Sequence, residues 1–218
     1  RRLLTTRECE GCSLRHAELA GADLRNTRLK GAGVHGDLHG ADFRGADLTN
    51  VSFSGDLTQV DFRGAKIEGA SFCNSVLKDA RFDGMDLREV KFADATHWSG
   101  AILRDVNLEH VSFYGYGGYH RTQPKHPLDV SWGGTYLNSV DLRGANLREA
   151  FFAKSDLRRA DLRGADLRNA VMPYPEDLQG AQLSGAIWID GRRCAEGSVG
   201  YCIPEGNATR DQRRRRKN

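Results

Sequence analysis

The chain of 218 residues is poor in the residue types that build an ordinary globular core. Only 39% of its residues are apolar and 8% are aromatic, and it has five prolines and two methionines. No stretch approaches the roughly 20 apolar residues of a membrane-spanning helix, so none is expected. With so few apolar residues, either much of the chain is disordered or its core is thin and linear.

The chain also has little excess of one sign of charge over the other. The net charge of +3 results from 32 basic and 29 acidic residues, and the basic run 213–217 accounts for more than the excess. A polar tail of this kind, residues 204–218, is typically disordered. Contact of the tail with nucleic acid or an anionic membrane is the alternative. The chain begins at Arg1 without an initiating methionine or an apolar signal segment, which we interpret as a processed N-terminus compatible with export.

Glycine, in contrast, is abundant at 25 residues, and it follows an internal repeat. A large apolar residue recurs every five positions, with single-residue slips at Leu38 and Leu57. Gly often stands two positions after it, and a small or β-branched residue two positions before it. The large residues are Leu14, Leu19, Leu24, Leu29, Val34, Leu38, Phe43, Leu48, Phe53, Leu57, Phe62, Ile67, Phe72, Leu77, Phe82, Leu87, Phe92, Trp98, Leu103, Leu108, Phe113, Trp132, Leu137, Leu142, Leu147, Phe152, Leu157, Leu162, Leu167, Met172, Leu178, Leu183 and Trp188.

A period of five matches neither the helix period of 3.6 nor the strand period of 2. It indicates a backbone that turns a quarter revolution per repeat, with the small and the large residue both pointing inward. Four repeats then close one coil, and successive coils are hydrogen-bonded at roughly 4.8 Å. About 33 repeats predict about eight coils and a rod of roughly 40 Å.

Segments such as Ala41-Asp42-Phe43-Arg44-Gly45 and Ala160-Asp161-Leu162-Arg163-Gly164 resemble the A(D/N)LXX unit of the pentapeptide-repeat family. The resemblance covers residues 13–189 apart from one insertion. It implies an all-β fold, a right-handed four-sided β-helix. We expect an N-terminal cap at 1–12, solenoid at 13–113, an inserted loop at 114–131, solenoid at 132–189, a C-terminal cap at 190–203 and the basic tail at 204–218.

Four of the five cysteines lie in two local pairs at opposite ends of the repeat region, and Cys73 stands alone. Because the ends of a rod cannot meet, the pairs are not expected to form one zinc site. Two structural disulfides, Cys9–Cys12 and Cys194–Cys202, are the favoured interpretation, and reduced or buried thiols are the alternative. Disulfides would place the protein outside a reducing cytosol. The arrangement resembles exported family members of the periplasm or thylakoid lumen; a cytoplasmic location is the alternative.

The segment 114–131 breaks the period with three tyrosines, two histidines and two prolines. Loops that leave a repeat array often carry contacts. One hypothesis is therefore a recognition loop, and the other is an inert excursion packed on one face. The candidate interaction residues are Tyr116, Tyr119, His120, Arg121 and His126.

The pattern offers no pocket for chemistry, because the predicted interior is filled with Leu, Phe and Ala. We expect no catalytic residues, no cofactor and no metal. Asp often precedes the large residue and Arg often follows it, which predicts a mesh of surface ion pairs.

Three functions from different classes follow. The first is a structural or interaction module that binds a protein partner. The sequence does not indicate the oligomeric state of this chain. The second is an anionic partner, nucleic acid or membrane, bound through the tail and a basic face of Arg143, Arg148, Arg163 and Arg168. The resemblance adds DNA mimicry toward a type II topoisomerase, which requires an acidic rod. This chain departs from that requirement, and nucleic acid is not an expected partner.

Overall fold

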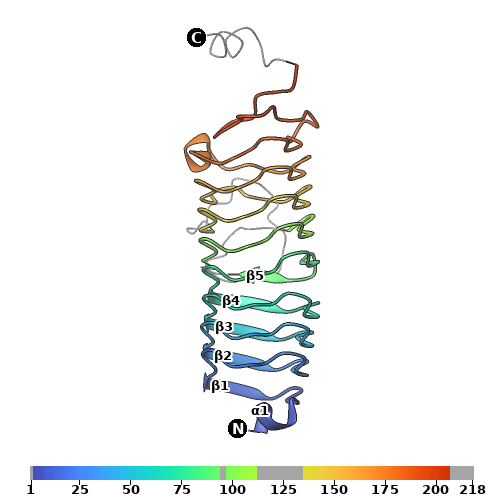
Figure 1. Ribbon diagram of the computed structural model, residues 1–218, viewed down its shortest axis with the longest axis vertical. Helices are drawn as coiled ribbons and strands as arrows, with labels where there is room; N and C mark the ends of the chain where they lie inside the picture. Colours follow the sequence, from blue (N-terminus) through green and yellow to red (C-terminus); the bar gives the residue numbers. More distant parts are fainter. Residues whose placement is uncertain (1, 94–96, 112–134, 207–218) are drawn as a thin grey trace, which may run out of the picture.

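The computed structural model describes residues 2–93, 97–111 and 135–206, which form a four-sided parallel β-solenoid that is long in one direction (Figure 1). Parallel bridges between successive coils form four columns, one on each side, and neighbouring columns are five residues apart in the chain. In one coil the bridges join Tyr136 to Asp156, Asp141 to Asp161, Asn146 to Asp166 and Phe151 to Val171. The predicted all-β, four-sided solenoid is therefore confirmed. Within the described residues, no helix has the length and apolar character needed to cross a membrane.

One side of the first five coils is a continuous parallel sheet, and the other sides are made of isolated bridges. The sheet runs in chain order through β1 (Ser13–Glu18), β2 (Gly33–Asp37), β3 (Ser52–Asp56), β4 (Ser71–Val76) and β5 (Lys91–Ala93). A short helix, α1 (Arg2–Thr6), precedes the first coil, and a 3-10 helix, η1 (Pro175–Leu178), interrupts a late one. Figure 1 shows α1 at one end of the stack and the last described residues, up to 206, at the other.

The repeat 141–145 satisfies all five of its backbone N–H groups. Asp141 donates to the carbonyl of Ala101 in the preceding coil, and Leu142 and Gly144 donate to the following coil. The N–H of Ala145 closes the corner by donating to the carbonyl of Leu142 at 3.1 Å. The remaining N–H, that of Arg143, donates to the Asp141 carboxylate at 3.3 Å. Since unpaired backbone groups are costly, this complete pairing explains how so few apolar residues suffice.

Glycine recurs because the third residue of the corner has a positive φ. Gly144, for example, has a φ of 68°. This left-handed conformation is easy for glycine and costly for most other residues.

The two slips in the period coincide with strands that run straight through a corner. Gly36 and Gly55, with φ of 143° and 108°, lie in neighbouring strands β2 and β3 and stack directly on each other. A Cβ at Gly55 would overlap the carbonyl oxygen of Gly36. Close approach of the two backbones therefore requires glycine at position 55. The repeats that contain Gly36 and Gly55 are four residues long.

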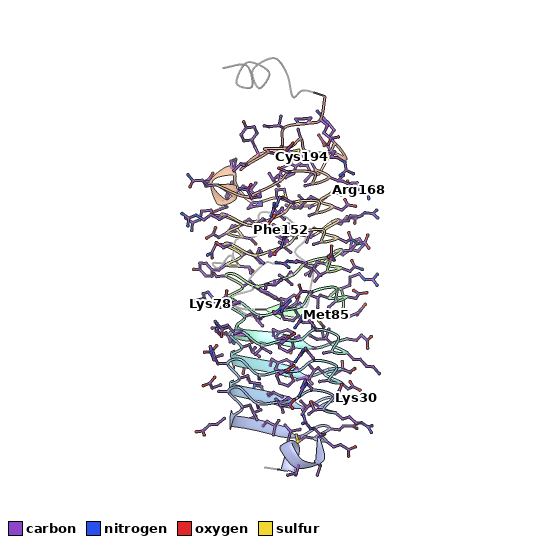
Figure 2. All side chains as sticks on the ribbon, viewed as in Figure 1. Lys30, Lys78, Met85, Phe152, Arg168 and Cys194 are labelled. Carbon is purple, nitrogen blue, oxygen red and sulfur yellow. A yellow bond between two sulfur atoms is a disulfide. The ribbon has the colours of Figure 1, made fainter. Side chains whose placement is uncertain are left out.

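The interior is a solid column whose composition changes along the axis. In the first coils, rings from two opposite sides stack along the axis and meet edge to face across it. These rings belong to Phe43, Phe53, Phe62, Phe72, Phe82 and Phe92. In the later coils leucines fill the same positions, and Phe152 is the one fully buried ring among residues 135–206. Figure 2 shows Phe152 in the interior and Lys30, Lys78 and Arg168 at the periphery.

The solenoid continues in register across the inserted segment. His97 is bridged to Tyr136, Ile102 to Asp141 and Asn107 to Asn146, so the coil before the insertion contacts the coil after it directly. Two expected inward residues, Phe113 and Trp132, lie outside the described residues, as do the candidate loop 114–131 and most of the tail.

Both ends of the described column are covered by cap segments. Leu3 of α1 is buried and belongs to the core cluster, so the N-terminal segment covers the first coil as expected. At the other end the chain reverses direction, because Val199 pairs antiparallel with Gln182 and Arg193 with Ile187. The reversal ends the parallel stacking.

Candidate interaction surfaces

One side of the solenoid carries an ordered array of charge pairs, which we call the arginine–aspartate face. It consists of the carboxylates and arginines that flank the same buried residue in successive coils. The pairs are Asp23–Arg25, Asp42–Arg44, Asp61–Arg63, Asp141–Arg143 and Asp161–Arg163. Between them the order is reversed in Arg81–Asp83, and Ile102 replaces the acid before Arg104.

The local geometry of each pair follows from the turn. The Asp42 carboxylate accepts from the N–H of Arg44 at 3.1 Å, and the Arg44 guanidinium closes back onto it through Nε and Nη2 at 2.9 and 2.6 Å. Such two-point pairing fixes the orientation of the guanidinium plane. The carboxylate is the more buried partner, so the guanidinium forms the outer surface.

The pairs also connect neighbouring coils. Arg44 lies 3.8 Å from Asp61, and Arg143 lies 3.5 Å from Asp161. Arg104 donates to Asp141 at 2.6 Å across the insertion. Burial raises the pKa of Asp141, but hydrogen bonds from Arg143 and Arg104 outweigh it and lower this pKa to about 2. The result is a nearly neutral network of fixed charges.

The candidate basic face is divided between two adjacent sides of the solenoid. Arg143 stacks near Arg163 on one side, and Arg148 near Arg168 on the next, as the twenty-residue spacing predicts. Arg143, Arg163 and Arg168 are paired with the aspartate two positions earlier. Arg148 lies 3.6 Å from Glu109. These arginines therefore form no unpaired positive stripe.

The structure places the four paired cysteines as two disulfides at the ends of the solenoid. Cys9 is bonded to Cys12 beside α1, and Cys194 to Cys202 in the C-terminal cap, with Cα atoms 5.5 and 5.0 Å apart. Cys194 is fully buried, which anchors the second bond in the core. Cys73 is a half-buried free thiol.

The remaining predictions concern the loop and chemistry. Tyr116, Tyr119, His120, Arg121 and His126 all lie outside the described residues. In the described part of the chain, His, Cys, Asp and Glu nowhere gather in groups of three that could hold a metal ion.

One feature was missed from the sequence: a pair of stacked rings at positions where an acid is usual. His97 and Tyr136 lie in adjacent coils with ring centroids 4.7 Å apart and planes 6° from parallel. Tyr136 takes the place of the common Asp before the large residue, and this substitution was the available signal. The stacking itself joins residues on opposite sides of the insertion.

A family model described as "Pentapeptide repeats" matches eight copies at residues 8–50, 34–55, 56–94 and 135–172, more than half of the chain. No curated protein matches the chain significantly. Among solved structures, the chain is similar to HetL, a pentapeptide repeat protein involved in heterocyst differentiation regulation from the cyanobacterium Nostoc sp. strain PCC 7120. The identity is 28%, over 85% of this chain and 89% of HetL, with a TM-score of 0.35.

Two further similar structures have lower identity. QnrB1, a plasmid-mediated fluoroquinolone resistance protein, is 20% identical over 82% of this chain and 89% of its own, with a TM-score of 0.32. A pentapeptide repeat protein from the Arabidopsis thaliana thylakoid lumen is 17% identical over 68% and 70%, with a TM-score of 0.21.

Proposed function

Because this chain belongs to the pentapeptide-repeat family, we propose that it is a non-enzymatic scaffold that presents rigid solenoid faces to a protein partner. The observation that carries the proposal is the arginine–aspartate face. Its guanidiniums are already oriented by bonds to their own repeat and to the next coil. A surface that is ordered before binding loses little conformational entropy when a partner docks.

The same face favours a protein over a polyanion. A polyanion binds through unpaired cations, and the affinity then falls steeply with salt. Here the arginines are paired with carboxylates, so the face offers directional donors and acceptors with little net charge. We expect the affinity for the partner to change little between 50 and 200 mM salt. Over the same range, the affinity for a polyanion typically falls about a thousandfold.

The inserted loop is part of the proposal as a second contact. Its candidate residues Tyr116, Tyr119, His120, Arg121 and His126 stand in a segment that leaves the repeat pattern. The solenoid stacks in register on both sides of it, which fixes where the segment leaves and rejoins the column.

We further propose an extracytoplasmic location, the periplasm or thylakoid lumen, supported by the two cap disulfides. Alkylation of the protein from its native source under denaturing, non-reducing conditions tests this. One modified cysteine, Cys73, is the expected result. Five modified cysteines would show reduced thiols and contradict the proposed compartment.

Capture of partners from native extract tests the scaffold function. The bait is the full chain, compared with Arg44→Gln/Arg63→Gln, with a deletion of residues 116–128, and with the matched control Lys30→Gln/Lys78→Gln on other sides. We expect one specific protein to be retained by the wild type and the control, and lost from the face variant or the loop deletion. A partner set that none of these changes alters would contradict the proposal.

A further inference from the structure

The stacked rings belong to a short column of uncharged and aromatic side chains on one side of the solenoid. Parallel bridges join Val76 to His97, His97 to Tyr136 and Tyr136 to Asp156. Tyr136 is 48% exposed, although its position in the repeat is usually taken by a short acid. An exposed aromatic ring on an otherwise polar surface suggests a contact for a ligand.

Tyr136 borders a surface depression of about 570 Å³ that extends over the next two coils. Its other lining residues are Asn138, Ser139, Asp156, Arg158, Arg159, Gln179 and Gly180. The volume lies within the range of small-molecule sites, roughly 300–1,000 Å³. The lining combines one aromatic ring with amides, a hydroxyl and guanidiniums, so both stacking and hydrogen bonds are available.

The Tyr136 ring lines this depression and is about half exposed. One face of the ring is covered by His97, which stacks on it from the preceding coil. Asp156 follows in the next coil, but its carboxylate is turned toward Arg158, whose Nε and Nη2 donate at 2.8 and 2.7 Å. The Asp156 side chain is only 14% exposed and does not extend outward like the ring. A planar group could therefore continue the stack as a third ring.

The residues that line the depression include two arginines and one aspartate. Arg158 is paired with Asp156 and also interacts with Asp177 of the next coil, whereas Arg159 is exposed and has no ion-pair partner among the described residues. The stem of Arg159 runs beside Gly180 of the next coil, where an added Cβ would lie 3.4 Å from its Cγ. The amide of Asn138 has its oxygen bonded to the Ser99 hydroxyl at 2.7 Å, which directs that amide group.

We propose that this depression binds a nucleoside monophosphate. The base stacks on Tyr136 and continues the His97–Tyr136 column, since aromatic rings are sequence-tolerant platforms for bases. The phosphate pairs with Arg159 through charge-assisted hydrogen bonds. Asn138 and Gln179 provide hydrogen bonds to the ribose or to the base edge. This binding site is separate from the arginine–aspartate face and goes beyond the scaffold function.

Isothermal titration of the full chain with adenosine monophosphate tests the proposal, with adenosine and ribose 5-phosphate as partial ligands. We expect a dissociation constant below 1 mM for the nucleotide and at least tenfold weaker binding of either part. Tyr136→Ala should weaken nucleotide binding about tenfold through loss of stacking, and Tyr136→Phe should preserve it. Arg159→Gln should weaken the nucleotide several-fold and leave adenosine unchanged.

Matched controls are Tyr174→Ala, which removes a tyrosine that is 61% exposed outside the depression, and Arg168→Gln on another side. Both should bind as the wild type does. Absence of binding at 5 mM nucleotide would overturn the proposal, as would nucleotide binding that Tyr136→Ala leaves intact. Equal affinity for ribose 5-phosphate and the nucleotide would also overturn it, because the ring would then contribute nothing.

Discussion

At the scale of the residue, the aspartate of the repeat is first a backbone cap and only second an ion-pair partner. Its carboxylate accepts from the N–H two positions later, as Asp42 does for Arg44 and Asp156 for Arg158. That N–H is the one in each repeat without a backbone acceptor. The side-chain oxygen of Asn146 accepts from the N–H of Arg148 in the same way, which explains why either Asp or Asn can occupy this position.

Substitutions of Asp141 separate the cap from the charge. Asp141→Ala leaves the N–H of Arg143 unpaired and removes the partner of Arg104, so we expect a loss of roughly 1–3 kcal/mol of unfolding free energy at pH 7. Asp141→Asn keeps the cap and should lose less. Urea unfolding measures both. Equal losses would show that the cap contributes nothing.

The pH dependence provides a check on the same residue. The folded-state pKa of Asp141, about 2, lies below its ordinary value of 3.8. Its stabilising contribution is therefore complete above pH 3.8 and declines as the pH falls toward 2. The stability difference between the wild type and Asp141→Asn should narrow over this window, and a constant difference would contradict the assigned ion pair.

Two glycines with positive φ should differ sharply when changed to alanine. Gly55→Ala places a Cβ onto the Gly36 carbonyl oxygen, whereas Gly64→Ala meets open space and carries only the strain of a φ of 69°. We expect roughly 1–2 kcal/mol for Gly64→Ala and clearly more for Gly55→Ala. Thermal unfolding compares them. A Gly55→Ala variant as stable as Gly64→Ala would contradict the close packing of β2 on β3.

At the scale of the element, the sequence predicted the period, the inward residues and the two slips. A five-residue pattern leaves few backbone solutions, so Leu24, Leu142 and Leu162 were identified as core from spacing alone, and all three are fully buried. The reason for the slips was not predictable, because it depends on Gly36 and Gly55 facing each other across coils. Cap segments were expected at both ends. The antiparallel reversal at Val199 could not be predicted, because the sequence after the last repeat follows no period.

The stacking across the insertion can be tested with a cross-link. Ser99 and Asn138 lie in adjacent coils although 39 residues separate them, and their side chains are hydrogen-bonded. Coils about 4.8 Å apart are within the Cα range of disulfides. Ser99→Cys/Asn138→Cys should therefore cross-link on oxidation, detected by a mobility shift without reductant. The control Ser99→Cys/Arg158→Cys spans two coils and should not cross-link. Failure of Ser99→Cys/Asn138→Cys to cross-link under the same oxidation would contradict the direct stacking across the insertion.

At the scale of the whole molecule, the fold was readable from the sequence and the surface sites were not. Repetition fixes the column, and each coil constrains only its neighbours. The arginine–aspartate face was anticipated as a mesh of ion pairs, but not the way its arginines are oriented across coils. The depression beside Tyr136 arises where residues 136, 156 and 180 of three successive coils lie side by side, a juxtaposition that depends on coil register. The loop residues Tyr116, Tyr119, His120, Arg121 and His126 stay a prediction.

The central claim is that the backbone turns a quarter revolution every five residues and pairs coil to coil along the whole column. Native-state amide hydrogen exchange resolved by residue tests it most directly. In a repeat such as 141–145, four N–H groups bond to backbone carbonyls, and the fifth, after the large residue, bonds only to a surface carboxylate. We therefore predict slow exchange with a faster position one residue after the large residue of each repeat, on both sides of the insertion, as at Arg88 and Arg143. Uniform protection over helix-length segments, or protection without a five-residue period, would contradict the account.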